Sequence, residues 1–176
     1  METVAPFETE TQSDSPQTAT VAGQQLRDAM GSFLTGVTIV TARSEDGTPY
    51  GLTVNSFNSV SLDPPLVLWS LDLKNNRTDL FRSAKGFTVN IMPASSESLI
   101  RKFAAADADR FNDTIWHWGV SKQPVLDEAL TSLECRLWAE YPGGDHAIFV
   151  GEVINIRHGQ GSPAAYFKGR LSAFPD

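Results

Sequence analysis

Small polar side chains recur at alternate positions between Gly51 and Asp63, and they are the clearest chemical signal in this chain. Hydroxyl and amide residues alternate there with apolar ones, so an extended segment presents one polar face and one buried face. The polar face carries neutral hydrogen-bonding groups, which suit a planar, uncharged, polar ligand better than a metal ion or a catalytic triad. The alternative is a half-exposed edge strand that runs into a serine-rich loop. The polar residues are Thr53, Asn55, Ser56, Asn58, Ser59 and Ser61.

A second polar segment, Lys74–Asp79, stands at the start of a predicted short helix over 75–84. It combines two cations, two amides and a hydroxyl. Unpaired backbone N–H groups and the helix dipole favour an anion at such a position, so this segment is a candidate phosphate-binding element. The alternative is a solvated helix start that Asn76 or Thr78 caps.

The third signal is the Gly143–His146 segment. Its two glycines allow a tight turn between strands and close approach of a ligand to the backbone. Asp145 is placed to orient the imidazole of His146. A histidine at a hairpin corner also occurs as a purely structural residue, so both interpretations stay open.

Several familiar site signatures are absent from the sequence. It contains no Gly-x-Gly-x-x-Gly, no P-loop, no Gly-x-Ser-x-Gly and no His-Glu-x-x-His, and we predict no metal site. The segment 107–113 resembles a calcium loop, but Phe111 stands where an oxygen ligand belongs. The single cysteine, Cys135, excludes an intrachain disulfide and alternates with apolar neighbours, which predicts a buried core thiol in a reducing cytoplasm.

Composition favours one soluble domain. The chain has 176 residues, of which 41% are hydrophobic and 20% charged, and its net charge of -7 argues against a nucleic-acid-binding surface. We find no membrane span and no secretory signal, and therefore expect a cytoplasmic protein. Residues 1–22 are rich in Thr, Gln, Ser, Glu and Pro, which predicts a disordered tail before a single domain over 23–176.

Strands outnumber helices in the predicted element order, and the helices are short insertions between strands. This pattern favours an antiparallel β-barrel with peripheral helices over a doubly wound sheet. Asp46 and Gly47 form a strong turn signal and predict a hairpin between the first two strands. Residues 104–122 are expected to be irregular. The expected strands span 37–43, 50–57, 66–71, 86–92, 132–141, 147–157 and 165–171, and the expected helices span 24–34, 75–84 and 96–103.

Three segments, in this order, resemble the signature segments of the flavin reductase-like family: Thr35–Thr41, Gly51–Pro65 and Gly143–His146. The resemblance extends from about Leu26 to about Arg170. It implies a mainly β fold, the FMN-binding split barrel, which is usually a homodimer with flavin near the subunit interface. It also implies an NAD(P)H:flavin oxidoreductase that supplies reduced flavin to a partner monooxygenase.

The resemblance assigns roles to particular residues. His146 would lie beside the nicotinamide and is the one predicted catalytic residue. Asn90 would face the flavin, although it is equally a strand residue bonded to a neighbouring loop, and Arg170 would border the site. Ser59 and Ser61 would reach the ribityl chain or the phosphate of the flavin, or would only form hydrogen bonds within their own loop. The remaining predicted cofactor-binding residues are Thr53, Val54, Asn55 and Ser56 for the isoalloxazine, Thr35, Gly36, Val37 and Thr38 on the neighbouring strand, and Lys74, Asn76 and Thr78 for the phosphate.

The sequence therefore predicts hydride transfer from NADH to FMN or FAD, with the cofactors supplying the difficult chemistry. NADH is favoured over NADPH by family habit. The alternatives are a split-barrel protein that binds flavin without turnover, as a carrier or sensor, and an enzyme that uses another flavin-like carrier.

Overall fold

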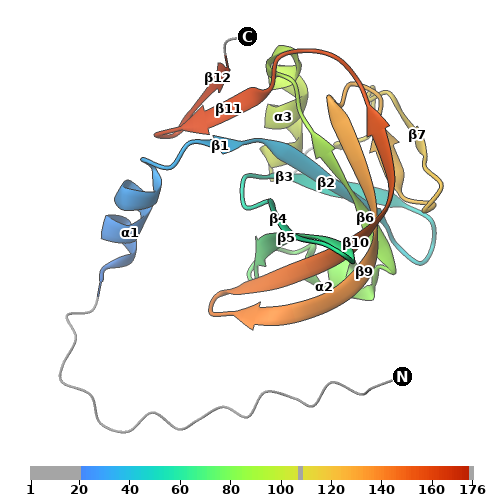
Figure 1. Ribbon diagram of the computed structural model, residues 1–176, viewed down its shortest axis with the longest axis horizontal. Coiled ribbons are helices and arrows are strands. Elements are labelled where there is room, and N and C mark those ends of the chain that lie inside the picture. The colour runs from blue at the N-terminus through green and yellow to red at the C-terminus, as the bar shows by residue number, and fades with distance from the viewer. Residues whose placement is uncertain (1–20, 107–108, 175–176) are drawn as a thin grey trace, which may run out of the picture.

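Seven antiparallel strands form the central sheet of the computed structural model, which describes residues 21–106 and 109–174. The sheet curls around a buried interior (Figure 1). In spatial order its strands are β3 (Pro49–Val54), β2 (Thr38–Arg43), β6 (Gly86–Ile91), β9 (Thr131–Gly143), β10 (His146–His158), β5 (Pro65–Asp72) and β4 (Asn58–Leu62).

The two edge strands of this sheet, β3 and β4, follow one another in the sequence. Residues 55–57 cross from one edge to the other, and no ladder joins these edges in the part of the chain that the structure describes. The hydroxyl of Ser56 bridges the opening instead, because it donates to the carbonyl of Ser70 in β5 and accepts from its N–H, both at 3.0 Å. The barrel is therefore split along this line, as predicted.

The predicted hairpin between β2 and β3 is confirmed. Arg43 pairs with Pro49 at its base, and Gly47 takes a φ of 92°, which a residue with a Cβ rarely adopts. The carboxylate of Asp46 accepts hydrogen bonds from the Ser44 hydroxyl at 2.5 Å and from the Thr48 N–H at 3.0 Å. These bonds hold the turn and lower the pKa of Asp46.

The barrel interior is built around aromatic side chains. Trp69 stacks on Phe149 with ring centroids 4.8 Å apart, and Phe81 and Phe87 meet Trp69 edge-on. Cys135 is fully buried in this cluster, which confirms the predicted core thiol, and burial raises its pKa to about 12. A second core lies against the helix α3 (Glu97–Ala104) and contains Val37, Ile39, Met92, Leu99, Ile100, Phe103, Leu126 and Ala164.

A smaller sheet of three strands, in the order β1-β11-β12, carries the C-terminal part of the domain. It consists of β1 (Thr35–Gly36), β11 (Ala164–Phe167) and β12 (Arg170–Ala173). The single strand predicted over 165–171 is wrong, because the chain turns at Lys168 and Gly169, whose φ angles are 46° and 78°. Positive φ at both central residues is the geometry of a tight hairpin turn.

The segment 104–122, predicted to be irregular, contains a strand. β7 (Trp116–Trp118) pairs with β8 (Pro124–Leu126) in a two-stranded sheet. The intervening turn is anchored to the barrel, since the carboxylate of Glu134 in β9 accepts from the N–H of Ser121 at 2.7 Å. Tertiary contacts, which no local pattern encodes, therefore order this segment.

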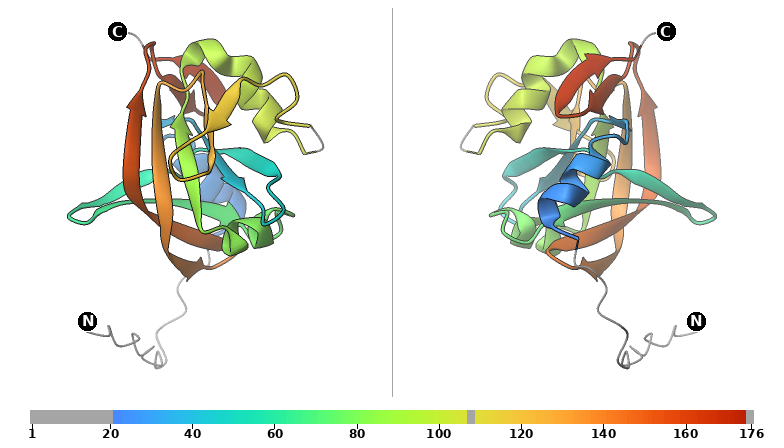
Figure 2. Two further views of the ribbon diagram at one scale, coloured as in Figure 1. Left: turned by 90° about the vertical axis from the view of Figure 1, so that its right-hand side faces the viewer. Right: turned by 90° about the vertical axis from the view of Figure 1, so that its left-hand side faces the viewer.

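The helices are short and peripheral. They are α1 (Gly23–Met30), α2 (Thr78–Ser83) and α3 (Glu97–Ala104), with a 3₁₀ turn, η1 (Ala94–Ser96), before α3. α3 packs on the barrel, whereas α1 stands apart from it and buries none of its residues (Figures 1 and 2). The predicted tail over 1–22 lies almost wholly outside the described residues. Within residues 21–106 and 109–174, no helix is long and apolar enough to cross a membrane.

Candidate functional site

Two adjoining cavities open on the side of the barrel where β3 ends and the β11–β12 turn approaches α1. Cavity A has a volume of about 810 Å³ and cavity B about 370 Å³, both within the usual range for small-molecule sites. Cavity A is lined by Arg27, Asp28, Met30, Gly31, Phe33, Thr35, Asn55, Ser56, Phe57, Asn58, Tyr166, Lys168 and Gly169. Cavity B is lined by Val37, Thr53, Val54, Asn55, Ile100, Arg101, Ala104, Tyr166, Gly169 and Leu171.

Three residues line both cavities and form their junction: Asn55, Tyr166 and Gly169. Across the described residues, the Asn55 amide and the Tyr166 phenol make no hydrogen bond to another side chain or to the backbone. Tyr50 shows the contrast, because its buried phenol donates to the carbonyl of Leu80 at 2.6 Å. The junction therefore offers polar groups that a bound molecule is free to use.

Residues 53–56, the predicted isoalloxazine platform, line both cavities. Two of its hydroxyls are already committed: Thr53 donates to the carbonyl of Ile100 at 2.7 Å, and Ser56 is bonded to Ser70. The side chain left for a ligand is Asn55, together with backbone groups of the same segment. Asn58–Leu62, which follows, is the exposed edge strand that the alternative interpretation anticipated.

Thr35 adds a buried polar atom to the wall of cavity A. Its hydroxyl oxygen is inaccessible to solvent and has no hydrogen-bond partner among the residues that the structure describes. A buried hydroxyl without a partner is costly, and a ligand with hydrogen-bonding groups would relieve that cost. The wall of cavity A therefore carries polar groups, the Asn55 amide among them, that can bond to a polar ligand.

Cations border both cavities although the whole chain is acidic. Arg27 and Lys168 line cavity A, and Arg101 lines cavity B. Arg101 is paired with Glu97 at 2.6 Å across one turn of α3, and both side chains are exposed. At the rim of cavity A, Arg27 and Lys168 outnumber the single carboxylate, Asp28, which favours ligands that carry phosphate there.

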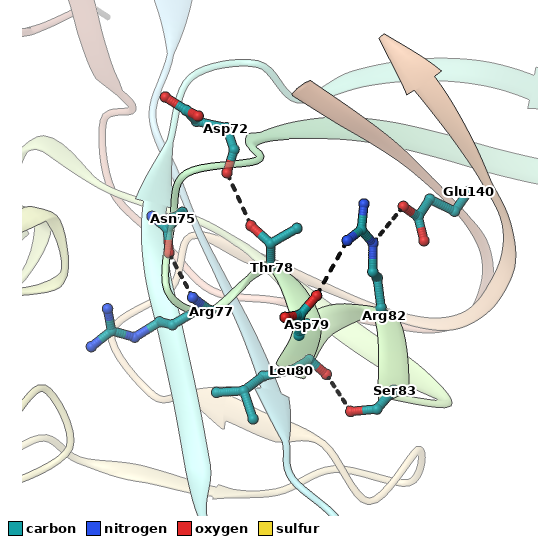
Figure 3. Close-up of polar contacts among 9 residues, drawn as sticks. All are labelled: Asp72, Asn75, Arg77, Thr78, Asp79, Leu80, Arg82, Ser83 and Glu140. Atoms are coloured by element: carbon teal, nitrogen blue, oxygen red, sulfur yellow. Dashed lines mark hydrogen bonds and ion pairs between the residues drawn. The ribbon is translucent and has the colours of Figure 1, made fainter. Parts of the chain in front are cut away.

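The segment Lys74–Asp79 leads into α2, and its polar groups bond to one another or to the flanking residues Asp72 and Arg82 (Figure 3). The Thr78 hydroxyl donates to the carbonyl of Asp72 at 2.9 Å, and the Asn76 side chain accepts from the Arg77 guanidinium at 3.0 Å. The Lys74 ammonium has no ion-pair partner among the described residues. None of these side chains lines cavity A or B.

Asn90 is completely buried within the barrel. Its amide donates to the carbonyl of Ile39 at 3.0 Å and to the Thr41 hydroxyl at 3.1 Å. Its oxygen accepts from the Leu126 N–H and the Ser132 hydroxyl, both at 3.0 Å. These bonds use the whole amide to join β6 to its neighbours, so Asn90 does not reach either cavity.

His146 stands at the tip of the β9–β10 hairpin, away from the lining of cavities A and B. Its Nδ1 lies 2.7 Å from the carboxylate of Asp145, and this contact lowers the pKa of Asp145. The imidazole is partly exposed in a small third cavity, cavity C, of about 220 Å³. Cavity C is lined by Leu73, Arg82, Glu140, Tyr141, Pro142, Gly144, His146 and Ala147.

The remaining predicted residues surround the cavities without lining them. Gly36 lies between two lining residues, and Thr38 is buried and donates to the carbonyl of Val54 at 3.2 Å. Arg170 is exposed between Gly169 and Leu171, which do line them. Ser59 and Ser61 lie on the edge strand β4, and Ser59 bonds through its N–H to Asn58.

The sequence predicted Asn55 at the junction of the two cavities but not Tyr166 or Gly169. Sequence reasoning considered the segment Tyr166–Arg170 only for its arginine, whereas the structure brings Tyr166 and Gly169 to both cavities. The Lys-Gly pair in this segment is a turn signal that favours a hairpin. It also missed Arg27 and Arg101, whose exposed helical positions carry no local sign of a site.

Comparison with known proteins identifies the family. The family model described as "Flavin reductase like domain" matches residues 30–175, and the chain therefore belongs to this family. It is 40% identical over 151 residues to "FMN reductase (NADH) SmoA" of Agrobacterium fabrum, with 86% of each chain covered. It is 41% identical over 150 residues to the reductase component of a 4-nitrophenol 4-monooxygenase/4-nitrocatechol 2-monooxygenase of Rhodococcus opacus, covering 85% of this chain and 80% of the relative.

Solved structures agree with the assignment. The NADH:FAD oxidoreductase SgcE6 of Streptomyces globisporus, in complex with NAD and FAD fragments, superposes with a TM-score of 0.82 at 35% identity. The match covers 90% of this chain and 98% of that one. The family and the split-barrel fold predicted from the sequence are thus confirmed.

Proposed function

We propose that this protein is an NADH-dependent flavin reductase that uses FMN or FAD. The observation that carries the proposal is the pair of cavities that meet at Asn55, because two ligands must bind side by side for a direct transfer between them. Bound together, the cofactors supply the chemistry: a hydride leaves C4 of the dihydronicotinamide with its electron pair and forms a bond to flavin N5. The protein has to hold the reacting atoms about 3–3.5 Å apart.

The chain's own residues suit these tasks. We assign the polar edge of the isoalloxazine to Asn55, to the Thr35 hydroxyl and to backbone groups of 53–56. Thr53 and Ser56 act by fixing that segment against Ile100 and Ser70. Lys74 lines neither cavity, and we assign it to the flavin phosphate because the family resemblance implies this role and its ammonium has no ion-pair partner among the described residues. Thr78 and Asn76 shape the segment that presents it, since their polar groups are already bonded.

We further propose a homodimer. Apolar side chains of the α1 region are exposed in the single chain, and so are those of Trp138, Ile154 and Ile156 on β9 and β10. Uncovered apolar surface of this kind marks an interaction site. His146 lines neither cavity A nor cavity B of its own chain, so its assignment to the nicotinamide, which the family resemblance implies, requires that a second copy bring its hairpin tip to the cavities. The exposed α1-region residues are Leu26, Met30, Phe33 and Leu34.

A flavin-dependent oxygenase is the proposed partner, supported by the relative that is the reductase component of a two-substrate monooxygenase. We place the protein in the cytoplasm, supported by its single, unpaired and buried cysteine.

The deciding experiment is NADH oxidation by purified, flavin-free protein, followed at 340 nm. We expect oxidation only when FMN or FAD is added, and slower oxidation with NADPH. Flavin binding without NADH oxidation would instead identify a carrier or sensor. Oxidation in a rigorously flavin-free sample would contradict the proposal outright.

A further inference from the structure

We propose that Tyr166 is the residue that positions the two reacting rings, by packing between cavities A and B and donating its phenol hydrogen to the ligand held beside Asn55. The inference rests on the proposed function and adds to it a positioning residue that the family motifs in this sequence do not include.

The placement of Tyr166 is the first argument. It lies on β11, the middle strand of the small sheet, where it pairs with Thr35 on one side and with Leu171 on the other. Its ring packs against the second core, the cluster that contains Ile39 and Phe103. A residue held by two strands and a core has little freedom to move, which is what precise positioning requires.

The makeup of the junction is the second argument. Gly169 has no side chain, so the Asn55 amide and the Tyr166 ring are the side chains that stand between the two cavities. Whatever ring binds in one cavity meets its counterpart beside these two groups. An aromatic ring at that point offers a flat surface for offset stacking and thereby limits the tilt of the ligand.

The free phenol is the third argument. Within the described part of the chain the Tyr166 hydroxyl has no hydrogen-bond partner, although the residue is half-buried. The phenol oxygen is not among the buried atoms without a partner, so it opens toward the cavities or solvent and can donate to a carbonyl or carboxamide edge of either ligand.

Phe167 provides a matched control on the same strand. It follows Tyr166 and therefore points to the opposite face of β11. It is exposed, lines neither cavity, and packs beside the Lys168 ammonium, which lies 5.4 Å from its ring. Replacing Phe167 removes its contact with Lys168 at the rim of cavity A but leaves the junction residues Asn55, Tyr166 and Gly169 unchanged, so it controls for changes to this strand and rim.

The test compares Tyr166→Phe, Tyr166→Ala and Phe167→Leu with the wild type. Calorimetric titration of flavin-free protein with FMN gives the dissociation constant, and stopped-flow bleaching of the flavin band at saturating NADH gives the reduction rate. We expect Tyr166→Ala to weaken FMN binding and to slow reduction by about 100-fold, the effect of misplacing a reacting atom by about 1 Å. Tyr166→Phe keeps the ring and should slow reduction by about 10-fold or less. Phe167→Leu should match the wild type.

A stereochemical readout separates positioning from general damage. With NADH deuterated at one face of C4, the wild type should transfer label from one face only, and Tyr166→Ala should transfer it from both. Wild-type binding, rate and stereochemistry in both Tyr166 variants would overturn the inference while leaving the proposed function intact. A wild-type protein that fails to reduce flavin would overturn the proposed function itself. Tyr166→Phe, which is nearly isosteric, decides the case if Tyr166→Ala does not fold.

Discussion

The carboxylate of Glu134 occupies the space beside Gly119 that any other residue's Cβ would fill. A Cβ at Gly119 would lie within 2.8 Å of both carboxylate oxygens, too close for any real contact. The carboxylate is held there because it accepts from the Ser121 N–H at 2.7 Å and from the Asn155 amide at 2.8 Å. This buried group therefore joins the β7–β8 turn to β9 and β10.

Gly119→Ala should destabilise the protein by about 1–3 kcal/mol, because the added methyl group forces the Glu134 carboxylate out of its hydrogen bonds. Chemical denaturation measures the change. Gly23→Ala is the control, since a Cβ at Gly23 would meet nothing within 4 Å. Equal free energies of unfolding for the two variants would show that the turn accommodates the methyl group without loss of stability.

The free energy of unfolding should fall at acidic pH because the Glu134 carboxylate becomes protonated. Burial alone would raise the pKa of this carboxyl, but hydrogen bonds from Ser121 and Asn155 outweigh burial and lower it below its ordinary value of 4.5. The unfolded chain then binds the proton more readily, so the stabilisation is complete above pH 4.5 and is lost as pH falls through the lower folded value. Denaturation at a series of pH values should show this slope in the wild type and a smaller one in Glu134→Gln. Identical slopes would exclude the carboxyl as its source.

Asn55→Ala should weaken flavin binding, because a polar edge of the ring loses its partner at a cost of about 1–3 kcal/mol. Quenching of flavin fluorescence on titration gives the dissociation constant. Asn112→Ala serves as the control, since that amide lies on an exposed loop and bonds to Asp113. An unchanged dissociation constant in folded Asn55→Ala would mean that the 53–56 segment acts through its backbone alone.

His146→Ala should leave flavin affinity nearly unchanged and slow the reduction of bound flavin by NADH by about 100-fold. Stopped-flow absorbance separates the two effects. His117→Ala is a close match, because His117 is also a half-exposed histidine with its Nδ1 bonded to an aspartate, Asp127, at 2.6 Å. If flavin binding and reduction are lost together, the hairpin tip shapes the whole site and His146 has no separate role. If neither changes, His146 is a surface residue.

Local patterns in the sequence were sufficient for most of the barrel. Alternating polar and apolar residues predicted the strands, and Asp46 with Gly47 predicted the first hairpin, because both signals depend on neighbours in the chain. The prediction was wrong at two hairpins: β7 and β8 pair across the turn at 119–123, and the strand predicted over 165–171 divides at Lys168 and Gly169.

The sequence by itself determined the family and the split barrel, through three ordered segments that resemble the family's, and it determined the polar character of 53–56 through residue spacing. Only the tertiary structure decided which polar groups remain available to a ligand. Thr53, Thr78 and Asn90 look alike in sequence as donors and acceptors, yet each is bonded to a backbone carbonyl contributed by another part of the fold. Asn55 follows the edge strand β3 and Tyr166 lies on the middle strand β11, far away in the chain, and the fold brings both to the junction without a protein hydrogen-bond partner among the described residues.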